Sequence, residues 1–499
     1  MEMSKYMIER HSGVQASDNI AVQAPIDRLR TLILFVFPAL GGLLFGFDIG
    51  ASSSALPILE NVSTSGVSWG QFSVLTAGIV TSASLFGALL GSLAAFLLKD
   101  RAGRKAELLF AAGSYGVGAV LSTAAQNVPM LVIGKLIYGL GIAFALHAAP
   151  AYLAEMGHPK IRGLLIGLKE VFIGIGIELG LLVGLPCLNL VGGWRIVFGV
   201  ALVPAVIMAS GMAFLPESPR WLLLAGKPER AKAALMWARG KAAKDANVLN
   251  KEFDDITNMS SDLNEVRGLF FIFQRRFLRQ LGVGLSLMFF QQVTGQPSVL
   301  YYATKMFEKA GLRMGAEASG IAGVLGAFKL AMTCVAVLTV DSAGRRPLLL
   351  VGVAGMCFSA LLVGVASLIS YGSMAVTYIA IVGLFGFIGS YQMSFGPISW
   401  IMVGEVFPLA VRGPAIALAT LTNFGTNFVV ALVLPSIQKL FGLGWLYVGF
   451  AIMTAVSWVV IYLIVPETKG RTLEEIEAVL LGKTVPKPPK LAKEDSGEV

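Results

Sequence analysis

The segment "DRAGRK" at residues 100–105 places four charged side chains and one glycine between two long apolar runs. A near copy, "DSAGRR", stands at residues 341–346. Charge is sparse in the chain as a whole, because only 14% of the 499 residues are charged and 56% are hydrophobic. Soluble domains carry about 25% charged residues. The composition therefore excludes an ordinary soluble protein and indicates a membrane protein.

The apolar runs are long enough to cross a bilayer as helices, which takes roughly 20 residues each. Residues 347–404 contain no Asp, Glu, Lys or Arg and hold two such spans. The runs lack the alternation of barrel strands, so helices must satisfy the backbone in lipid. We predict an all-helical membrane protein with twelve spans. The predicted spans are 31–58, 71–98, 107–126, 129–155, 163–188, 194–215, 278–304, 316–340, 347–369, 375–403, 413–437 and 443–465.

The cations predict the orientation of these spans. Most of the 39 Lys and Arg residues lie in the two tails and in the loops after even-numbered spans. By the positive-inside rule, both termini are expected in the cytoplasm. The net charge of +9 then reflects topology beside membrane lipid, and no nucleic-acid partner is expected. Asn61-Val62-Ser63 is a glycosylation sequon in a predicted outer loop, and its use stays open.

The two charged segments belong to an internal repeat. Three motifs recur in the same order at nearly one offset. The matching pieces are Asp100 and Arg104 with Asp341 and Arg345, Glu155 and Arg162 with Glu405 and Arg412, and "PESPR" at 216–220 with "PETKG" at 466–470. The repeat predicts two pseudo-symmetric six-helix halves at 31–225 and 277–465, a cytoplasmic helical linker at 226–276, and cytoplasmic tails at 1–30 and 466–499.

The repeated charges also suggest a gate. Halves that rock about a central site need something at the cytoplasmic face that favours one open side. Acids beside bases can form ion pairs there when that face is shut. The cations could instead serve topology alone, but topology does not require the acids or the repeated Glu-to-Arg spacing. The gate candidates are Arg101, Arg104, Glu155, Arg162, Glu217, Asp341, Arg345, Arg346, Glu405, Arg412 and Glu467.

Five motifs resemble those of the sugar porter family within the major facilitator superfamily. They are "PESPRWLL" (216–223), "QQVTGQPSVLYYA" (291–303), "GRRPLLL" (344–350), "FGPISW" (395–400) and "PETKGRTLEEIE" (466–477). The wording is most similar to the plant-type vacuolar glucose transporter branch, over roughly residues 31–480. The resemblance implies a major facilitator fold, monosaccharide transport by alternating access, and function as a monomer in a plasma or vacuolar-type membrane.

Two charged residues inside spans are candidates for proton coupling. A charge at the centre of a span costs roughly 2.5–3.5 kcal/mol on insertion scales, so it marks a functional candidate. Asp48 lies in "LLFGFDIGAS" in the middle of span 1. The resemblance implies a proton-coupling role, because many symporters of the family carry Asp there and facilitators carry Asn. Lys135 on span 4 stands where symporters usually have Arg, and it lacks the guanidinium fork.

The sugar site is expected among amides and an aromatic ring. Gln291 and Gln292 on span 7 and Asn423 and Asn427 on span 11 both donate and accept hydrogen bonds. Trp400 on span 10 offers a flat apolar face. All five fall on the sugar porter's binding positions. The other reading of such polar residues is that they hold helices together.

Three positions depart from the family pattern. Pro297 replaces an amide, Glu170 on span 5 replaces a Gln, and Lys329 on span 8 replaces an Asn. Glu170 and Lys329 come from opposite halves. They could pair across the cavity or change selectivity, and we count both among the candidate substrate-binding residues.

We predict a secondary active hexose transporter, with glucose as the expected substrate and protons as the coupled ion. The alternatives are a facilitative sugar or polyol uniporter and a non-transporting sugar receptor. An enzyme is not expected, because the sequence shows no nucleophile with its base and no phosphate-binding loop. The three cysteines lack metal-ligand spacing, so neither a metal site nor a cofactor is expected.

Overall fold

Every element of regular structure in the described residues is a helix. The computed structural model describes residues 27–98, 102–158, 161–240, 249–254, 256–257, 272–309, 316–369, 374–407, 411–471 and 473–480. Nine described helices are long and apolar enough to cross a membrane. Each of the twelve predicted spans lies on helix, so the predicted fold class is confirmed.

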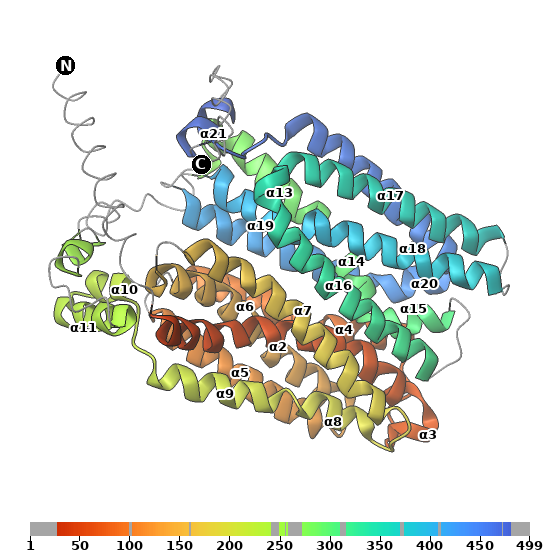
Figure 1. Cartoon of the computed structure of the whole chain (residues 1–499). Helices are drawn as coiled ribbons and strands as arrows, with labels where there is room; N and C mark the ends of the chain where they lie inside the picture. The colour runs from red at the N-terminus through yellow and green to blue at the C-terminus, as the bar shows by residue number, and fades with distance from the viewer. Residues whose placement is uncertain are drawn as a thin grey trace, which may run out of the picture.

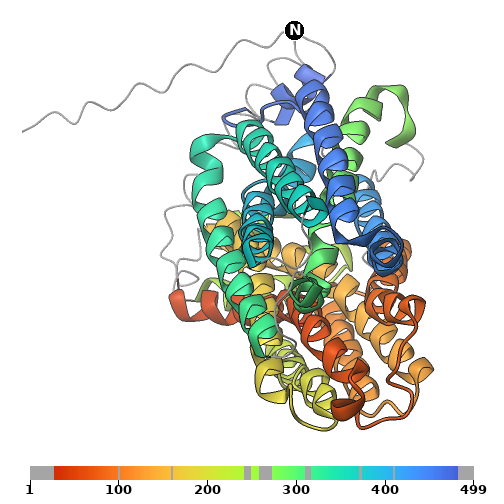
Figure 2. The same cartoon turned by 90° about the vertical axis from the view of Figure 1, so that its right-hand side faces the viewer.

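The helices form two groups that lie side by side (Figures 1 and 2). The N-terminal group contains α2 (Arg28–Glu60), α3 (Val62–Ser65), α4 (Val74–Leu98), α5 (Arg104–Thr123), α6 (Val128–Met156), α7 (Arg162–Cys187), α8 (Gly193–Gly199) and α9 (Leu202–Phe214). The C-terminal group contains α13 (Leu278–Val293), α14 (Gln296–Tyr301), α15 (Ala303–Lys309), α16 (Ala316–Ala343), α17 (Arg345–Ile369), α18 (Met374–Met393), α19 (Phe395–Val406), α20 (Arg412–Ile464) and α21 (Leu473–Leu480).

Short helices lie between the two groups in the order of the chain. They are α10 (Pro219–Leu224), α11 (Pro228–Arg239) and the 3-10 helix η4 (Arg275–Phe277). Pro228 occupies the first turn of α11, where its missing N–H costs nothing, as the sequence indicates. We call the end of the molecule that carries α10, α11 and α21 the charged end, and the end that carries α3 and α15 the opposite end (Figure 1).

Three predicted spans are not continuous helices. Gly295, with φ +88°, separates α13 from α14 in span 7. Ser394 separates α18 from α19 in span 10, and span 6 is divided between α8 and α9. Conversely, α20 joins spans 11 and 12 across a kink at Gly442. These breaks were not predicted, because the apolar pattern runs through them without interruption.

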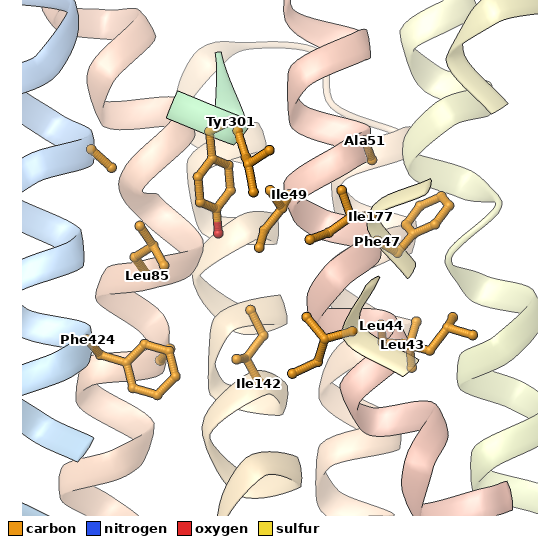
Figure 3. Packing of buried hydrophobic residues seen from close by; sticks show 14 of the residues in the cluster. Leu43, Leu44, Phe47, Ile49, Ala51, Leu85, Ile142, Ile177, Tyr301 and Phe424 are labelled. Atoms are coloured by element: carbon orange, nitrogen blue, oxygen red, sulfur yellow. The ribbon is translucent and has the colours of Figure 1, made fainter. Parts of the chain in front are cut away.

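Helices α2 and α7 approach until their backbones touch. A Cβ on Gly46 would lie 1.9 Å from the carbonyl oxygen of Ile173, and one on Gly176 would lie 2.0 Å from that of Leu43. Small residues permit such contact in lipid. Around this contact, Leu43, Phe47 and Ile177 pack in the buried core (Figure 3). The two helices therefore hold a fixed relative position.

The two groups meet along α4 with α20 and along α7 with α16. A Cβ on Gly78 of α4 would lie 2.5 Å from the carbonyl oxygen of Leu432. The rings of Phe86 and Phe428 also pack across this contact, tilted by 37° with centroids 5.0 Å apart. Phe424 and Tyr301 of the C-terminal group join the same buried cluster as the N-terminal core (Figure 3).

Candidate functional site

A cavity lies between the two helical groups and receives side chains from both. Its walls include all seven residues that the sequence assigns to the sugar site: Glu170, Gln291, Gln292, Lys329, Trp400, Asn423 and Asn427. These seven residues come from five helices, α7, α13, α16, α19 and α20, and converge on one place. The sequence predicts that these residues lie close together. The role of each residue depends on its contacts.

The breaks in spans 7 and 10 shape this cavity. Gln296 and Pro297 follow the break at Gly295, and Gln392 and Gly396 flank the break at Ser394; all four line the cavity. A Cβ on Gly295 would lie 2.2 Å from the Phe450 ring, so glycine is needed there for space as well as for its positive φ. Discontinuous helices beside a central cavity are typical of transporter binding sites.

Gln291 is occupied by bonds within the protein. Its Nε2 donates to the carbonyl oxygen of Phe395 at 2.7 Å, and its Oε1 accepts from Asn423 Nδ2 at 2.6 Å. These bonds tie α13 to α19 and α20. Asn427 accepts a hydrogen bond from Ser298 Oγ at 3.3 Å. The helix-holding interpretation of the polar residues therefore describes the contacts of Gln291 and Asn423.

Three other amides around the cavity each have one buried atom without a partner in the described part of the chain. The atoms are Gln292 Oε1, Gln296 Nε2 and Gln392 Oε1. Buried polar atoms are nearly always hydrogen-bonded, so these three favour a polar ligand that both donates and accepts. Sequence reasoning missed Gln296 and Gln392. Gln296 stands in the "QQVTGQPS" motif, but only the helix break directs it to the cavity.

The charged residues of the cavity do not pair as a simple bridge across it. Glu170 Oε1 lies 3.7 Å from Lys169 Nζ of the same helix. The Lys169 ammonium also lies 5.4 Å from the centroid of the Trp400 ring in the other half. Lys329 is 7% exposed, and the described residues give it no salt bridge. Glu170 and Lys329 thus face one cavity without direct contact.

Asp48 and Lys135 form the predicted pair. Lys135 Nζ donates to Asp48 Oδ1 at 2.9 Å and to Ser52 Oγ at 2.7 Å. Ser84 Oγ donates to the other carboxylate oxygen of Asp48 at 2.6 Å. The two charged side chains are only 5% and 2% exposed. The pair joins α2 to α6 inside the N-terminal group and does not line the central cavity.

The repeated charges of the N-terminal group meet at the charged end. Arg104 lies 3.4 Å from Glu155, and Ser218 Oγ donates to the same carboxylate. Glu217 accepts from the backbone amide of Lys105 at 3.0 Å. Burial raises the pKa of the Glu217 carboxyl, while this amide bond and the Arg104 charge oppose the rise.

The C-terminal group repeats this geometry. Arg345 lies 3.2 Å from Glu405, and Glu467 accepts from the backbone amides of Arg345 and Arg346 at 3.1 Å each. Both salt bridges therefore stay within one group. Arg101 lies outside the described residues, and the structure does not describe the side chains of Arg162, Asp341 and Arg412.

At the opposite end, by contrast, polar contacts join the two groups. Lys305 of α15 lies 2.6 Å from Glu60 of α2. Ser53 Oγ and Thr304 Oγ1 are 3.4 Å apart. Asn61 stands next to this contact, exposed, and caps α3 by accepting from the amide of Ser63.

Two helical groups around a central polar cavity, with a buried ion pair beside it, define a membrane transporter of the major facilitator fold. Residues 34–480 match the family described as "Sugar (and other) transporter". The chain belongs to this family.

Named relatives cover nearly the full chain. One is the D-xylose-proton symporter-like 2 protein of Arabidopsis thaliana, with 44% identity over 90% of this chain and 91% of that protein. Another is the glucose transporter GlcP of Staphylococcus epidermidis, with 34% identity over 91% of this chain and 98% of that protein. The xylose transporter XylE of E. coli, in a partially occluded inward-open conformation, matches with TM-score 0.74 and 27% identity, over 89% of this chain and 99% of that chain.

Proposed function

We propose that this chain is a secondary active transporter that moves a monosaccharide across a membrane by alternating access, coupled to protons. The observation that carries the proposal is the cavity between the two groups, which is lined by Gln292, Gln296 and Gln392, each with one buried amide atom that has no partner among the described residues. Sugar hydroxyls both donate and accept, so they suit this mixed set. Trp400 supplies the flat apolar wall that the carbon face of a sugar ring requires.

The relatives support a sugar that moves with protons. Their names include a D-xylose-proton symporter-like protein and a glucose transporter, and we propose a hexose such as glucose as the main substrate, with D-xylose as the competing pentose. We assign Asp48 and Lys135 to proton coupling. The chain acts as a monomer surrounded by lipid, in a plasma or internal membrane, with the charged end in the cytoplasm.

Uptake of labelled sugar into proteoliposomes tests this function. We expect glucose to accumulate when a pH gradient is imposed, and to equilibrate without accumulation when the gradient is collapsed. D-xylose and a polyol serve as the alternative substrates. Equilibration that ignores the gradient would indicate a facilitator. Sugar binding without any flux would indicate a receptor.

We assign the repeated charges to a gate at the charged end. The Arg104–Glu155 and Arg345–Glu405 salt bridges lie within their own groups, and the groups are joined by Lys305 and Glu60 at the opposite end, as expected when the charged end is open. When that end closes, the acids Glu155 and Glu405 become available to bases of the other group, and Arg162 and Arg412 are proposed among these partners. Glu217 and Glu467 brace the same loops from within each group.

Gln292→Ala should weaken sugar binding more than it slows turnover. The change removes a cavity amide whose Oε1 has no partner among the described residues, and a lost hydrogen bond in a polar site costs roughly 1–3 kcal/mol, or about 5- to 150-fold in Kd. Sugar binding to purified protein measures this. Gln438→Ala is the control, since Gln438 is a buried amide that contacts Met306 away from the cavity. An unchanged Kd in Gln292→Ala would place the sugar elsewhere.

Glu405→Gln should slow transport while leaving sugar affinity less affected. The change removes the charge that the closed gate needs, at a cost that lies between about 0–1 kcal/mol for an exposed pair and 3–5 for a buried one. A cysteine placed at Leu146 in the cavity wall, in a background without the native cysteines, reports the open fraction by its reaction with a thiol reagent. We expect faster reaction in Glu405→Gln. Glu229→Gln, an exposed acid in α11, is the control; equal rates in all three proteins would refute the gate.

A further inference from the structure

One half-buried carboxyl lies in the contact between the two groups and has no hydrogen bond or salt bridge to the residues that the structure describes. Glu178 belongs to α7 and faces α16, where a Cβ on Gly326 would lie 2.2 Å from Glu178 Oε2. The carboxyl therefore occupies the space that glycine leaves. Its Oε2 is buried and has no hydrogen bond in the described part of the chain. We call this contact of Glu178 with Gly326 and its neighbours Gly174, Leu181 and Leu330 the α7–α16 seam.

The seam is apolar around the carboxyl. Leu181 lies 3.0 Å from the Cβ position of Gly326, and one turn away Leu330 lies 2.9 Å from that of Gly174. Glycine at 326 and leucines on both sides offer no donor. A carboxylate needs cations or hydrogen-bond donors to remain charged away from water.

Among the side chains that the structure describes, no cation supplies that need. Helix α7 packs on α2, α6, α8 and α16. The charged residues on α7 itself and on these four helices are Arg28, Arg30, Asp48, Glu60, Lys135, His147, Glu155, Arg162, Lys169, Glu170, Arg195, Glu317, Lys329 and Asp341. None of those whose side chains the structure describes forms a hydrogen bond or salt bridge with Glu178. Asp48 and Lys135 bind each other, and Arg195 binds the carbonyl oxygen of Thr123.

The nearest candidate along the chain is Lys329, one turn from Gly326 on α16. Lys329 lines the sugar cavity, whereas Glu178 does not. Glu178 lies two turns beyond Glu170 along α7, on the side of the opposite end. It is therefore separate from both the sugar site and the Asp48 pair.

We propose that Glu178 is a second proton-binding site, which holds its proton while the seam is closed and loses it when the opposite end opens. This inference rests on the proposed transport by alternating access, in which α7 and α16 separate at that end. Opening admits water to the carboxyl and stabilises its charged form; closing expels the water and requires the proton again.

Glu178 would exchange its proton with only one side of the membrane. The proton leaves to, and returns from, the solution at the opposite end, so Glu178 adds no proton to the coupled movement of sugar. It makes opening depend on pH on that side. Acid should keep the seam closed, and a higher pH should favour opening.

The test measures seam opening directly on the purified full-length chain in detergent, with the native cysteines replaced. Leu181→Cys reports the seam, because Leu181 is 3% exposed. Val62→Cys corrects for the pH dependence of thiol chemistry, because Val62 is 72% exposed in α3. We expect the ratio of the two labelling rates to rise from pH 5 to pH 8, by up to about tenfold per pH unit, the limit for one proton.

Glu178→Gln should flatten this ratio across the pH range, and Glu178→Asp should keep the slope. If the Gln variant does not fold, Glu178→Met, of similar length and also uncharged, should give the same flat profile. An unchanged slope in a folded uncharged variant would overturn the proposal. So would loss of gradient-driven sugar accumulation in Glu178→Gln, because a site outside the coupled path must leave accumulation intact.

Failure of the proposed function gives a different pattern. A wild-type chain that does not accumulate sugar would refute proton coupling, whereas the labelling slope would still report the seam. Asp48→Asn should lose accumulation and retain the slope. The two proton sites are thereby tested independently.

Discussion

Asp48→Asn should abolish sugar accumulation driven by a pH gradient while downhill exchange of sugar continues. Asp48 is 5% exposed and takes hydrogen bonds from Lys135 and Ser84. A buried carboxylate is stable when paired and favours the neutral acid when its cation is withdrawn. If only the paired or neutral forms allow the halves to rock, proton and sugar must move together. Asn imitates the neutral form permanently, so the movement continues without the proton.

Proteoliposomes with an imposed pH gradient measure accumulation, and counterflow of labelled sugar measures exchange. Asp27→Asn is the matched control, because Asp27 is the cap of the same helix and accepts from the amide of Arg30. We expect full accumulation in that variant. If accumulation persists in Asp48→Asn, another acid must carry the coupled proton, and Glu170 is the first residue to test.

Lys135→Met should destabilise the fold by about 3–5 kcal/mol while Asp48 is charged, since it leaves a buried carboxylate without its cation. Lys135 also binds Ser52 and lies 4.9 Å from the Phe198 ring, so little water is available to replace it. Adding Asp48→Asn removes the stranded charge. We expect the double variant to recover most of the lost stability.

Thermal unfolding of the purified variants measures this cycle. Lys305→Met is the control, because the Lys305–Glu60 pair is 20% and 30% exposed and exposed pairs contribute roughly 0–1 kcal/mol. The Lys305–Glu60 salt bridge, although shorter than the Lys135–Asp48 pair, should therefore contribute less to stability. A double variant no more stable than Lys135→Met alone would show that the loss comes from packing rather than from charge.

Much of this site was predictable because its residues carry chemistry that apolar spans seldom contain. Asp48, Lys135, Glu170 and Lys329 each stand out in an apolar run, and the internal repeat assigns them to two halves. Glu170 and Lys329 line one cavity, and Asp48 contacts Lys135 beside it, as the sequence indicated. Rarity of charge in lipid is the physical reason that sequence reasoning succeeds here.

The sequence does not predict which amides bond within the protein and which keep an atom without a partner. Gln291 and Gln292 are adjacent and identical in chemistry, yet Gln291 bonds to Phe395 and Asn423 while Gln292 leaves an oxygen free. A helix turns about 100° per residue, so neighbours face different surroundings that only the packed structure supplies. The break at Gly295, which brings Gln296 to the cavity, is likewise a tertiary feature.

The pairing of the gate charges was also beyond the sequence. The repeat identifies Arg104 with Glu155 and Arg345 with Glu405 as equivalent sets, but it carries no information on whether an arginine binds within its own half. The observed pairs lie within halves. Spacing along a chain describes neighbours on one helix, whereas contacts between bodies depend on which side is open.

The backbone contact of α2 with α7 couples the movement of one helix to the movement of the other. Gly46 touches the backbone at Ile173, Ile173 lines the sugar cavity, and Asp48 stands two residues beyond Gly46. No side chains lie between the two backbones at this contact, so none can rearrange to absorb a movement. A displacement of one helix therefore displaces the other. If Asp48 carries the coupled proton, as we propose, its binding would shift the cavity wall directly through this backbone contact. Alanine at position 46 would force the two backbones apart, because its Cβ would lie 1.9 Å from the carbonyl oxygen of Ile173, and would thereby break this direct connection.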